Sequence, residues 1–271
     1  MQSHTNSFNI LCLGDIVGQA GCDILQQELP GLIKANNIDF VIANIENAAA
    51  GFGFNHKVYK QLKKLNIDAF TSGNHVYAKR EVLEQFSDFD CLVRPYNFPA
   101  GHPGTGIRTF TKNNKKIAVI NVMGRVFMQQ LSSCPFNSMD HALKKVDADI
   151  IIVDFHAETT SEKQALGWYL KDRVSLFFGT HTHVQTNDCR LLSNKTGYLT
   201  DLGMCGAYNS VIGMDSSISI RKFRTQLPER HRPVKNPSEW VIGGLLLSVN
   251  NDSNTIDSIE AFNKVIKENG N

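Results

Sequence analysis

The sequence lacks the features that mark a membrane protein, a disulfide-rich scaffold or a structural zinc domain. Its six cysteines include no CxxC pair, which indicates reduced and mostly buried thiols. No apolar run approaches the roughly 20 residues that span a bilayer. The first residues carry neither the basic charge nor the apolar core of a signal peptide. We therefore expect a cytoplasmic protein with no membrane partner.

The sequence also has no large excess of positive or negative charge. The 28 Lys and Arg residues and 26 Asp and Glu residues give a formal net charge of +2, so composition does not predict a nucleic-acid groove or a membrane-binding surface. Hydrophobic residues make up 42% of the 271 positions, which is enough to bury the core of an ordinary globular chain. Function must therefore be inferred from local motifs.

The sequence does contain short β-branched runs that alternate with longer amphipathic segments, and this alternation predicts an α/β fold. Asn55 is expected to cap one helix, Ser161 and Gln164 to form a capping box on another, and Pro30 to kink or break a third. The predicted helices are 22–36, 56–65 and about 161–170. The predicted strands are 9–15, 39–47, 67–75, 115–124, 149–158, 173–183, 198–206 and 240–250.

The last third of the sequence has a different composition. Residues 221–238 are rich in Arg and Pro, and we expect them to form a long basic loop between two strands. The chain has no repeats, no low-complexity tract and no convincing linker. We therefore predict a single domain over residues 1–271.

Five apolar runs end in side chains that can bind a metal. Each side chain alone has an ordinary structural explanation as a turn residue or a buried histidine, so their repetition at predicted strand ends carries the prediction. In α/β sheets, ligands gather outside the carboxyl ends of the strands, where these side chains would meet. The candidates are Asp15, Glu46, Asn47, Asn74, His75, His156, His181 and His183.

This set of side chains predicts a centre that cleaves phosphoesters. Carboxylate, carboxamide and imidazole groups without thiolate favour Fe, Mn or Zn in an open site. Two such metals ~3.5–4 Å apart clamp the attacking and leaving oxygens and lower the pKa of bound water to about 7. We expect attack by metal-activated hydroxide, with His75 protonating the departing alkoxide because it directly follows a candidate ligand.

Two motifs resemble those of the calcineurin-like metallophosphoesterase superfamily. Gly73-Asn74-His75 is similar to its G-N-H block, and Gly179-Thr180-His181-Thr182-His183 to its G-H-x-H block. The sequence departs from the superfamily where Val17 replaces the histidine of the usual D-x-H motif, and where Glu46 replaces the usual bridging aspartate. The missing histidine leaves one metal site richer in oxygen ligands.

These departures resemble the YmdB family of bacterial metallophosphoesterases. The similarity runs roughly from residue 9 to 225 and includes NIENAAAGFG (44–53), DFHAETTSEKQALGWYL (154–170) and TDLGMCGAY (200–208). It implies a four-layer α/β/β/α sandwich and a dinuclear centre, with iron favoured and manganese or zinc as alternatives. It also implies phosphodiesterase activity on 2′,3′-cyclic or other cyclic nucleotides.

The resemblance further implies a role for each candidate. Glu46 would bridge the two metals, and His75 would be the proton donor. Asp154 and Glu158, which flank His156, are candidates to orient ligands, with plain surface charge as the alternative. The implied ligand sets are Asp15, Glu46 and His183, joined by Asn47, for one metal, and Glu46, Asn74, His156 and His181 for the other.

Two other functions stay open at this point. A phosphomonoesterase or nucleotidase would use the same metal clamp. A regulatory protein would use its metal site mainly to support a partner or RNA-turnover signalling, which the YmdB resemblance brings into consideration. The expected partner is a small phosphodiester or cyclic nucleotide, and the sequence leaves open an RNA-related partner, a homo-oligomer, the physiological substrate and the metal used in the cell.

Overall fold

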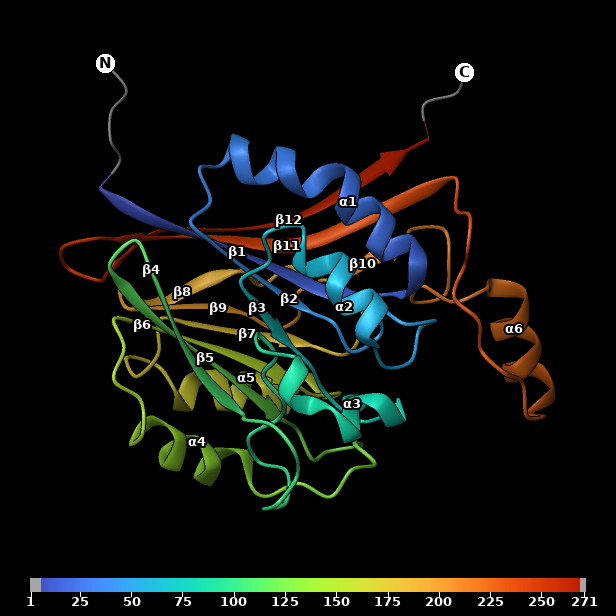
Figure 1. Ribbon diagram of the computed structural model, residues 1–271, viewed down its shortest axis with the longest axis horizontal. Helices are drawn as coiled ribbons and strands as arrows, with labels where there is room; N and C mark the ends of the chain where they lie inside the picture. Colours follow the sequence, from blue (N-terminus) through green and yellow to red (C-terminus); the bar gives the residue numbers. More distant parts are fainter. Residues whose placement is uncertain (1–5, 269–271) are drawn as a thin grey trace.

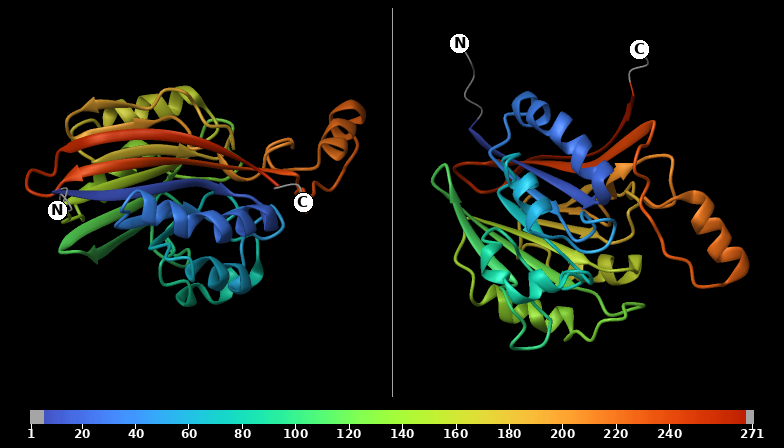
Figure 2. Two further views of the ribbon diagram at one scale, coloured as in Figure 1. Left: turned by 90° about the horizontal axis from the view of Figure 1, so that it is seen from above. Right: turned by 45° about the vertical axis from the view of Figure 1, so that its right-hand side comes forward.

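The computed structural model describes residues 6–268, and its framework is a pair of six-stranded β-sheets with helices on both outer faces. Helices α1 and α2 cover one sheet, and α4 and α5 cover the other, as the turned views make clear (Figures 1 and 2). The order of layers is therefore α/β/β/α, which confirms the predicted sandwich.

The first sheet has the strand order β12-β11-β10-β1-β2-β3. Strand β1 is parallel to β2 and β10, and β2 is parallel to β3, whereas β11 and β12 form an antiparallel hairpin whose first strand also pairs with β1. Because β1, β2 and β3 are parallel, the residues that follow them meet at one edge of the sheet. The strands are β1 (Ser7–Ile16), β2 (Phe40–Asn44), β3 (Ala69–Thr71), β10 (Met204–Ala207), β11 (Glu239–Asn250) and β12 (Ile256–Lys267).

The second sheet has the strand order β4-β5-β6-β7-β9-β8. Its four inner strands are parallel, and an antiparallel strand closes each edge. The carboxyl ends of β6 and β7 therefore also lie side by side. The strands are β4 (Ile107–Lys112), β5 (Lys115–Met123), β6 (Ile150–His156), β7 (Leu176–Thr180), β8 (Arg190–Ser193) and β9 (Thr196–Leu199).

The helices complete the outer layers, except for α6, which projects from one end of the molecule (Figure 1). They are α1 (Gly18–Ala35), α2 (His56–Lys63), α3 (Arg80–Glu84), the 3₁₀ helix η1 (Phe86–Asp88), α4 (Pro135–Leu143), α5 (Thr160–Tyr169) and α6 (Ser216–Thr225). Among residues 6–268, no helix has both the length and the apolar character needed to cross a membrane.

The side chains of β1 show how the layers are held together. Leu11 and Leu13 belong to the core that includes the buried face of α1, whereas Ile10 and Cys12 belong to the core between the two sheets. Such alternation follows from the period of two along a strand. A third core, which includes Phe155, lies between the second sheet and helices α4 and α5. Burying each large aliphatic or aromatic side chain contributes about 1.5–3 kcal/mol, so three apolar layers hold the four structural ones together.

The predicted strand over 198–206 is wrong as a single element, because β9 ends at Leu199 in the second sheet and β10 begins at Met204 in the first. The chain turns between them, where the Oδ1 atom of Asp201 accepts the N–H of Gly203 at 2.8 Å and Gly203 has a φ of +77°. Glycine adopts this left-handed conformation without steric cost. One apolar segment thus passes from one sheet to the other.

The predicted basic loop over 221–238 is wrong at its start, because α6 continues to Thr225. The side chain of Asp215 caps this helix by accepting the N–H of Ile218 at 3.0 Å. Residues 226–238 contain no helix and lead to β11.

Three smaller predictions concern helix ends and breaks. The N-cap at Asn55 is confirmed, since its side chain accepts the N–H of Val58 at 2.9 Å. Of the kink or break predicted at Pro30, the break is wrong: α1 continues through this exposed residue, where water can replace the lost backbone donor. The capping box of Ser161 and Gln164 is also wrong, because the N-cap of α5 is Thr159. The acidic side chain in the first turn, Glu162, accepts backbone N–H groups from the loop after β5.

Candidate metal centre

The structure brings all eight candidate residues together where the strand ends of the two sheets meet. The first sheet supplies Asp15 at the end of β1, Glu46 and Asn47 after β2, and Asn74 and His75 after β3. The second sheet supplies His156 at the end of β6, and His181 and His183 after β7.

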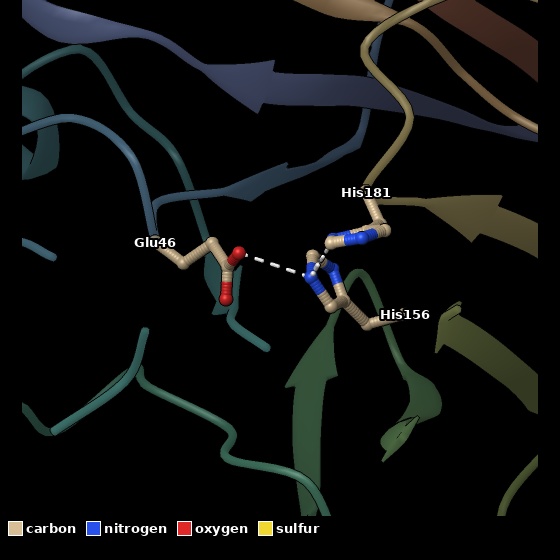
Figure 3. Close-up of side chains that lie close together, drawn as sticks. All are labelled: Glu46, His156 and His181. Atoms are coloured by element: carbon tan, nitrogen blue, oxygen red, sulfur yellow. Dashed lines mark hydrogen bonds and ion pairs between the residues drawn. The ribbon is translucent and has the colours of Figure 1, made fainter. Parts of the chain in front are cut away.

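Four of these residues converge on one point, and we call them the histidine group: Glu46, Asn74, His156 and His181. One ligand atom each from Glu46, His156 and His181 lies within 4.8 Å of the other two (Figure 3). The Nε2 atom of His156 is 3.0 Å from Glu46 Oε1, 2.8 Å from Asn74 Oδ1 and 3.1 Å from His181 Nδ1. Such convergence of oxygen and imidazole atoms is the arrangement that a metal ion requires.

Hydrogen bonds behind the imidazoles assign their protons. The Nδ1 atom of His156 is 2.8 Å from Thr180 Oγ1, whose hydroxyl donates to Asp154 Oδ1 at 2.7 Å. The Thr180 oxygen can then only accept from His156, so Nδ1 carries the proton and Nε2 presents a lone pair. The Nε2 atom of His181 lies 2.9 Å from Glu158 Oε2, which leaves the lone pair of this ring on Nδ1. Four electron-pair donors therefore face one another with no proton between them, and a cation satisfies all four.

A second set of side chains lies beside the first, and we call it the Asp15 group: Asp15, Asn47 and His183. The ring of His183 donates from Nδ1 to the backbone oxygen of Ile212 at 2.9 Å, so its Nε2 atom also presents a lone pair. That atom accepts from Asn47 Nδ2 at 2.9 Å and lies 3.9 Å from Asp15 Oδ1. The Asp15 group is looser than the histidine group but offers the same kinds of donor.

Burial makes both carboxylates unfavourable without a cation. Within the described residues, Asp15 Oδ1 and Glu46 Oε1 are buried atoms with no hydrogen-bond partner. Burial raises the pKa of Asp15 well above its usual range, with the nearby charge of Glu46 adding to the shift, and burial likewise raises the pKa of Glu46. Two orphaned carboxylate oxygens at neighbouring positions therefore fit a site for positive charge.

The imidazoles are neutral for the same reason. Burial lowers the pKa of His156 well below its usual range and lowers the pKa of His181 to about 3. Neutral imidazole is the form that binds metals. A bound cation would therefore neutralise the buried carboxylates and accept the lone pairs of the neutral histidines.

Backbone geometry keeps the ligands close together. His181 and His183 have φ values of +99° and +63°, and the N–H of His181 donates to Asp15 Oδ2 at 3.0 Å. Positive φ is unfavourable for histidine and is typical of functional sites, where surrounding contacts hold the strain. At Gly73, a Cβ atom would lie 2.2 Å from the His156 ring and 2.4 Å from Glu46 Oε2. Glycine before Asn74 is therefore a steric requirement of the site.

His75 lies beside the histidine group. Its N–H donates to Glu46 Oε2 at 3.1 Å, and its Nδ1 atom is 3.0 Å from Asn47 Oδ1. Since an amide oxygen only accepts, Nδ1 carries a proton and Nε2 is left for exchange with a ligand. The side chain is 25% exposed, and burial lowers the pKa of its ring. His75 can thus hold or release a proton at a position reached by solvent.

A buried ion pair supports the loop that carries His181 and His183, and the sequence did not reveal it. Lys163 Nζ lies 2.6 Å from Asp201 Oδ2 and donates to the backbone oxygen of Thr180 at 2.9 Å, and both side chains are 1% exposed. Asp201 also accepts the N–H of Thr182 at 3.3 Å. No local signal could have paired Lys163 with Asp201, because they lie 38 positions apart on different elements.

Comparisons with known proteins show the family of the chain. Residues 11–262 match the family described as YmdB-like protein. The chain is 41% identical over 253 residues to a 2′,3′-cyclic-nucleotide 2′-phosphodiesterase of Bacillus subtilis, covering 93% of this chain and 95% of that protein.

Two solved structures share the fold. One is described as a novel phosphatase from Mycoplasma pneumoniae and has 34% identity and a TM-score of 0.91, covering 97% of this chain and 95% of that one. The other, a hypothetical protein from Thermus thermophilus, has 34% identity and a TM-score of 0.88, covering 95% of this chain and 99% of that one. In both cases the match extends over almost the whole of each chain.

Proposed function

This chain belongs to the YmdB-like family and is a phosphoester hydrolase, and we propose that it hydrolyses phosphodiester bonds of cyclic nucleotides, with 2′,3′-cyclic nucleotides favoured, at a centre of two metal ions. One observation carries the proposal. His156 Nε2 and His181 Nδ1 present lone pairs toward Glu46 Oε1, which has no hydrogen-bond partner among the described residues. Without a cation this arrangement is repulsive.

The two groups of side chains divide the ligands. Glu46 would be a ligand of both metals, and iron suits this donor set, with manganese or zinc as alternatives. When bound, two such ions supply Lewis acidity toward the phosphoryl oxygens and a hydroxide nucleophile at neutral pH. The proposed ligands are Asp15, Asn47, Glu46 and His183 for one ion, and Glu46, Asn74, His156 and His181 for the other.

His75 would supply the proton for the leaving oxygen. Asn47 Oδ1 holds the ring by accepting from Nδ1, so Nε2 is the atom that would donate. Because burial lowers the pKa of this ring, its protonated form is a stronger acid than ordinary imidazolium. A general acid at this position contributes typically ~10²–10⁴-fold to rate.

The test combines metal analysis with activity assays on three esters. They are a cyclic diester (2′,3′-cyclic AMP), a diester with a good leaving group (bis(4-nitrophenyl) phosphate) and a monoester (4-nitrophenyl phosphate). We expect Glu46→Gln to lose metal and activity together, while Glu260→Gln on the exposed side of β12 keeps both. We expect His75→Ala to keep its metal but to lose ~10²–10⁴-fold with 2′,3′-cyclic AMP. The loss should be smaller with bis(4-nitrophenyl) phosphate, whose leaving group needs no proton. Full activity in both Glu46→Gln and His75→Ala would reject the proposal.

The same assay decides between this function and its competitors. Faster cleavage of the monoester would favour a phosphatase, the function named for the Mycoplasma pneumoniae structure. Metal binding without cleavage of any ester would favour a regulatory protein, for which an RNA-related partner and a homo-oligomer would then be examined.

A further inference from the structure

A pocket of about 520 Å³ opens directly beside His75. Asn74 and His75 line one side of it, so it shares a wall with the candidate metal centre. Its volume lies within the ~300–1,000 Å³ range of small-molecule sites and is far larger than one phosphate group needs. A substrate whose phosphate lies at the metal centre would therefore extend its remaining part into this pocket.

The wall next to His75 is an exposed aromatic ring. Phe52 is 51% exposed, although Ala48, Ala49 and Phe54 in the same loop are buried. Its ring centroid is 4.3 Å from that of His75, with an interplanar angle of 48°. Phe52 thus offers an apolar aromatic face to a ligand that enters the pocket beside His75.

The loop presents Phe52 in a defined position. Ala50, Gly51 and Gly53 all have positive φ, with values of +58°, +77° and +77°. At Gly53 an added Cβ would lie 3.0 Å from Ala78, so the loop is packed closely against the residues after His75. The glycines on either side of Phe52 adopt this backbone without steric cost, and the close packing at Gly53 places Phe52 next to the residues that line the pocket.

The other walls are partly aromatic and carry carboxamides. They include Tyr77, Phe98, His102 and the carboxamides of Gln129 and Gln130, and in the described part of the chain no Lys or Arg lines the pocket. Gln130 Nε2 donates to the backbone oxygen of Asn74 at 3.4 Å, so this loop reaches the site. Carboxamides offer both a donor and an acceptor, as the edge of a nucleobase requires.

A second hollow borders the same loop and has the opposite character. It is lined by Ala48–Ala50 together with Lys57, Lys79, Arg230, Arg232 and Lys235. Cationic side chains of this kind suit phosphates, whereas the Phe52 pocket suits a flat, uncharged ring. The two hollows therefore call for chemically different groups.

We propose that the Phe52 pocket binds the nucleobase of the substrate, with the base stacked on Phe52 and its edge facing Gln129 and Gln130. This assignment rests on the proposed function for the position of the phosphate, and it makes Phe52 a residue that determines specificity for nucleotides over simple cyclic phosphates. Base–aromatic stacking of this type is worth about 1–3 kcal/mol.

The experiment compares 2′,3′-cyclic AMP with a ribose 2′,3′-cyclic phosphate that has no base. The measured quantity is the ratio of kcat/KM for the two substrates. We expect Phe52→Ala to lower this ratio about 5- to 150-fold, mainly through KM, as loss of one stacking contact predicts. Phe52→Trp should restore the ratio, since it keeps an aromatic face. Phe223→Ala is the matched control, because Phe223 is an exposed ring on α6 that does not line the pocket.

A second readout does not depend on turnover. Adenosine carries no phosphate, and we expect it to bind the wild type and to bind Phe52→Ala about 5- to 150-fold more weakly in a calorimetric titration. An unchanged ratio in Phe52→Ala, no recovery in Phe52→Trp, or no binding of adenosine to the wild type would overturn the assignment. If the wild type binds adenosine through Phe52 but cleaves no cyclic nucleotide, the pocket stands and the proposed function fails.

Discussion

The two sheets contribute chemically different halves of the candidate centre. Every oxygen donor, from Asp15 to Asn74, follows a strand of the first sheet, whereas all three imidazole donors follow strands of the second. We call the residues from the first sheet the oxygen half and the three histidines from the second sheet the imidazole half, and neither half alone is a complete set of ligands. The centre therefore exists only when the two sheets are packed together, and binding of metal would add to the apolar contacts that hold them.

The halves also differ in how the protein supports them. The imidazoles of His156, His181 and His183 each have a hydrogen-bond or ion-pair partner on the side away from the centre. Asp15 and Glu46 each accept one backbone N–H, but their other oxygens, Asp15 Oδ1 and Glu46 Oε1, are buried and have no hydrogen-bond partner among the described residues. The second sheet thus holds its ligands in place before metal binds, and the first sheet leaves its charges to be neutralised by the metal.

The largest effect is expected from the buried ion pair behind the imidazole ligands, which joins Lys163 on α5 to Asp201 between β9 and β10. Replacing Lys163 by Met leaves Asp201 buried without its partner, and we expect the free energy of unfolding to fall by about 3–5 kcal/mol. Urea denaturation measures this change. The double variant with Asp201→Leu should recover part of the loss, because no lone charge then remains buried. A loss below about 1 kcal/mol in the single variant would mean that the pair does not support the imidazole half.

A somewhat smaller effect is expected from removing the metals, which tests the oxygen half. Binding to the folded state alone stabilises it by RT ln(1 + [L]/Kd), or about 2.7 kcal/mol at 100 times Kd. We therefore expect a chelator to lower the urea midpoint of the wild type while leaving Glu46→Gln unaffected. If the chelated wild type, shown by analysis to be free of metal, unfolds at the same urea concentration, the two halves do not depend on a cation.

The sequence predicted which side chains meet at the strand ends but not the contacts behind them, for a physical reason. A strand that ends in Asp15, or in His156, is a local pattern, and two such patterns meet whenever parallel strands share an edge. Long-range partners leave no local pattern. Asp154 was a candidate to orient His156, but it does so through the hydroxyl of Thr180, which the motif alone did not show.

The same limit applies to parts of the fold. Residues 198–206 read as one apolar strand, yet β9 and β10 lie in different sheets because the turn at Gly203 separates them. Phe52 was not among the candidate site residues, and its 51% exposure beside the buried Ala49 and Phe54 is visible only in the structure. Glycine permits a positive φ but does not require it, so the sequence alone does not show where the chain turns.

The smallest effect is expected from a single hydroxyl group of the second sheet. Thr180→Val keeps the shape of the side chain but removes the oxygen that accepts from His156 Nδ1, so the ring loses the contact that fixes its proton and orientation. Loss of such a supporting contact typically lowers metal affinity ~10- to 100-fold.

Competition with a chromophoric chelator measures the change, and Thr180→Ser, which keeps the hydroxyl, should bind metal as the wild type does. Thr109→Val on the exposed face of β4 makes the same substitution away from the site. Unchanged affinity in Thr180→Val would show that the imidazole half is not held by its hydrogen bonds, and the contrast between the two sheets would then reduce to the kinds of ligand they carry.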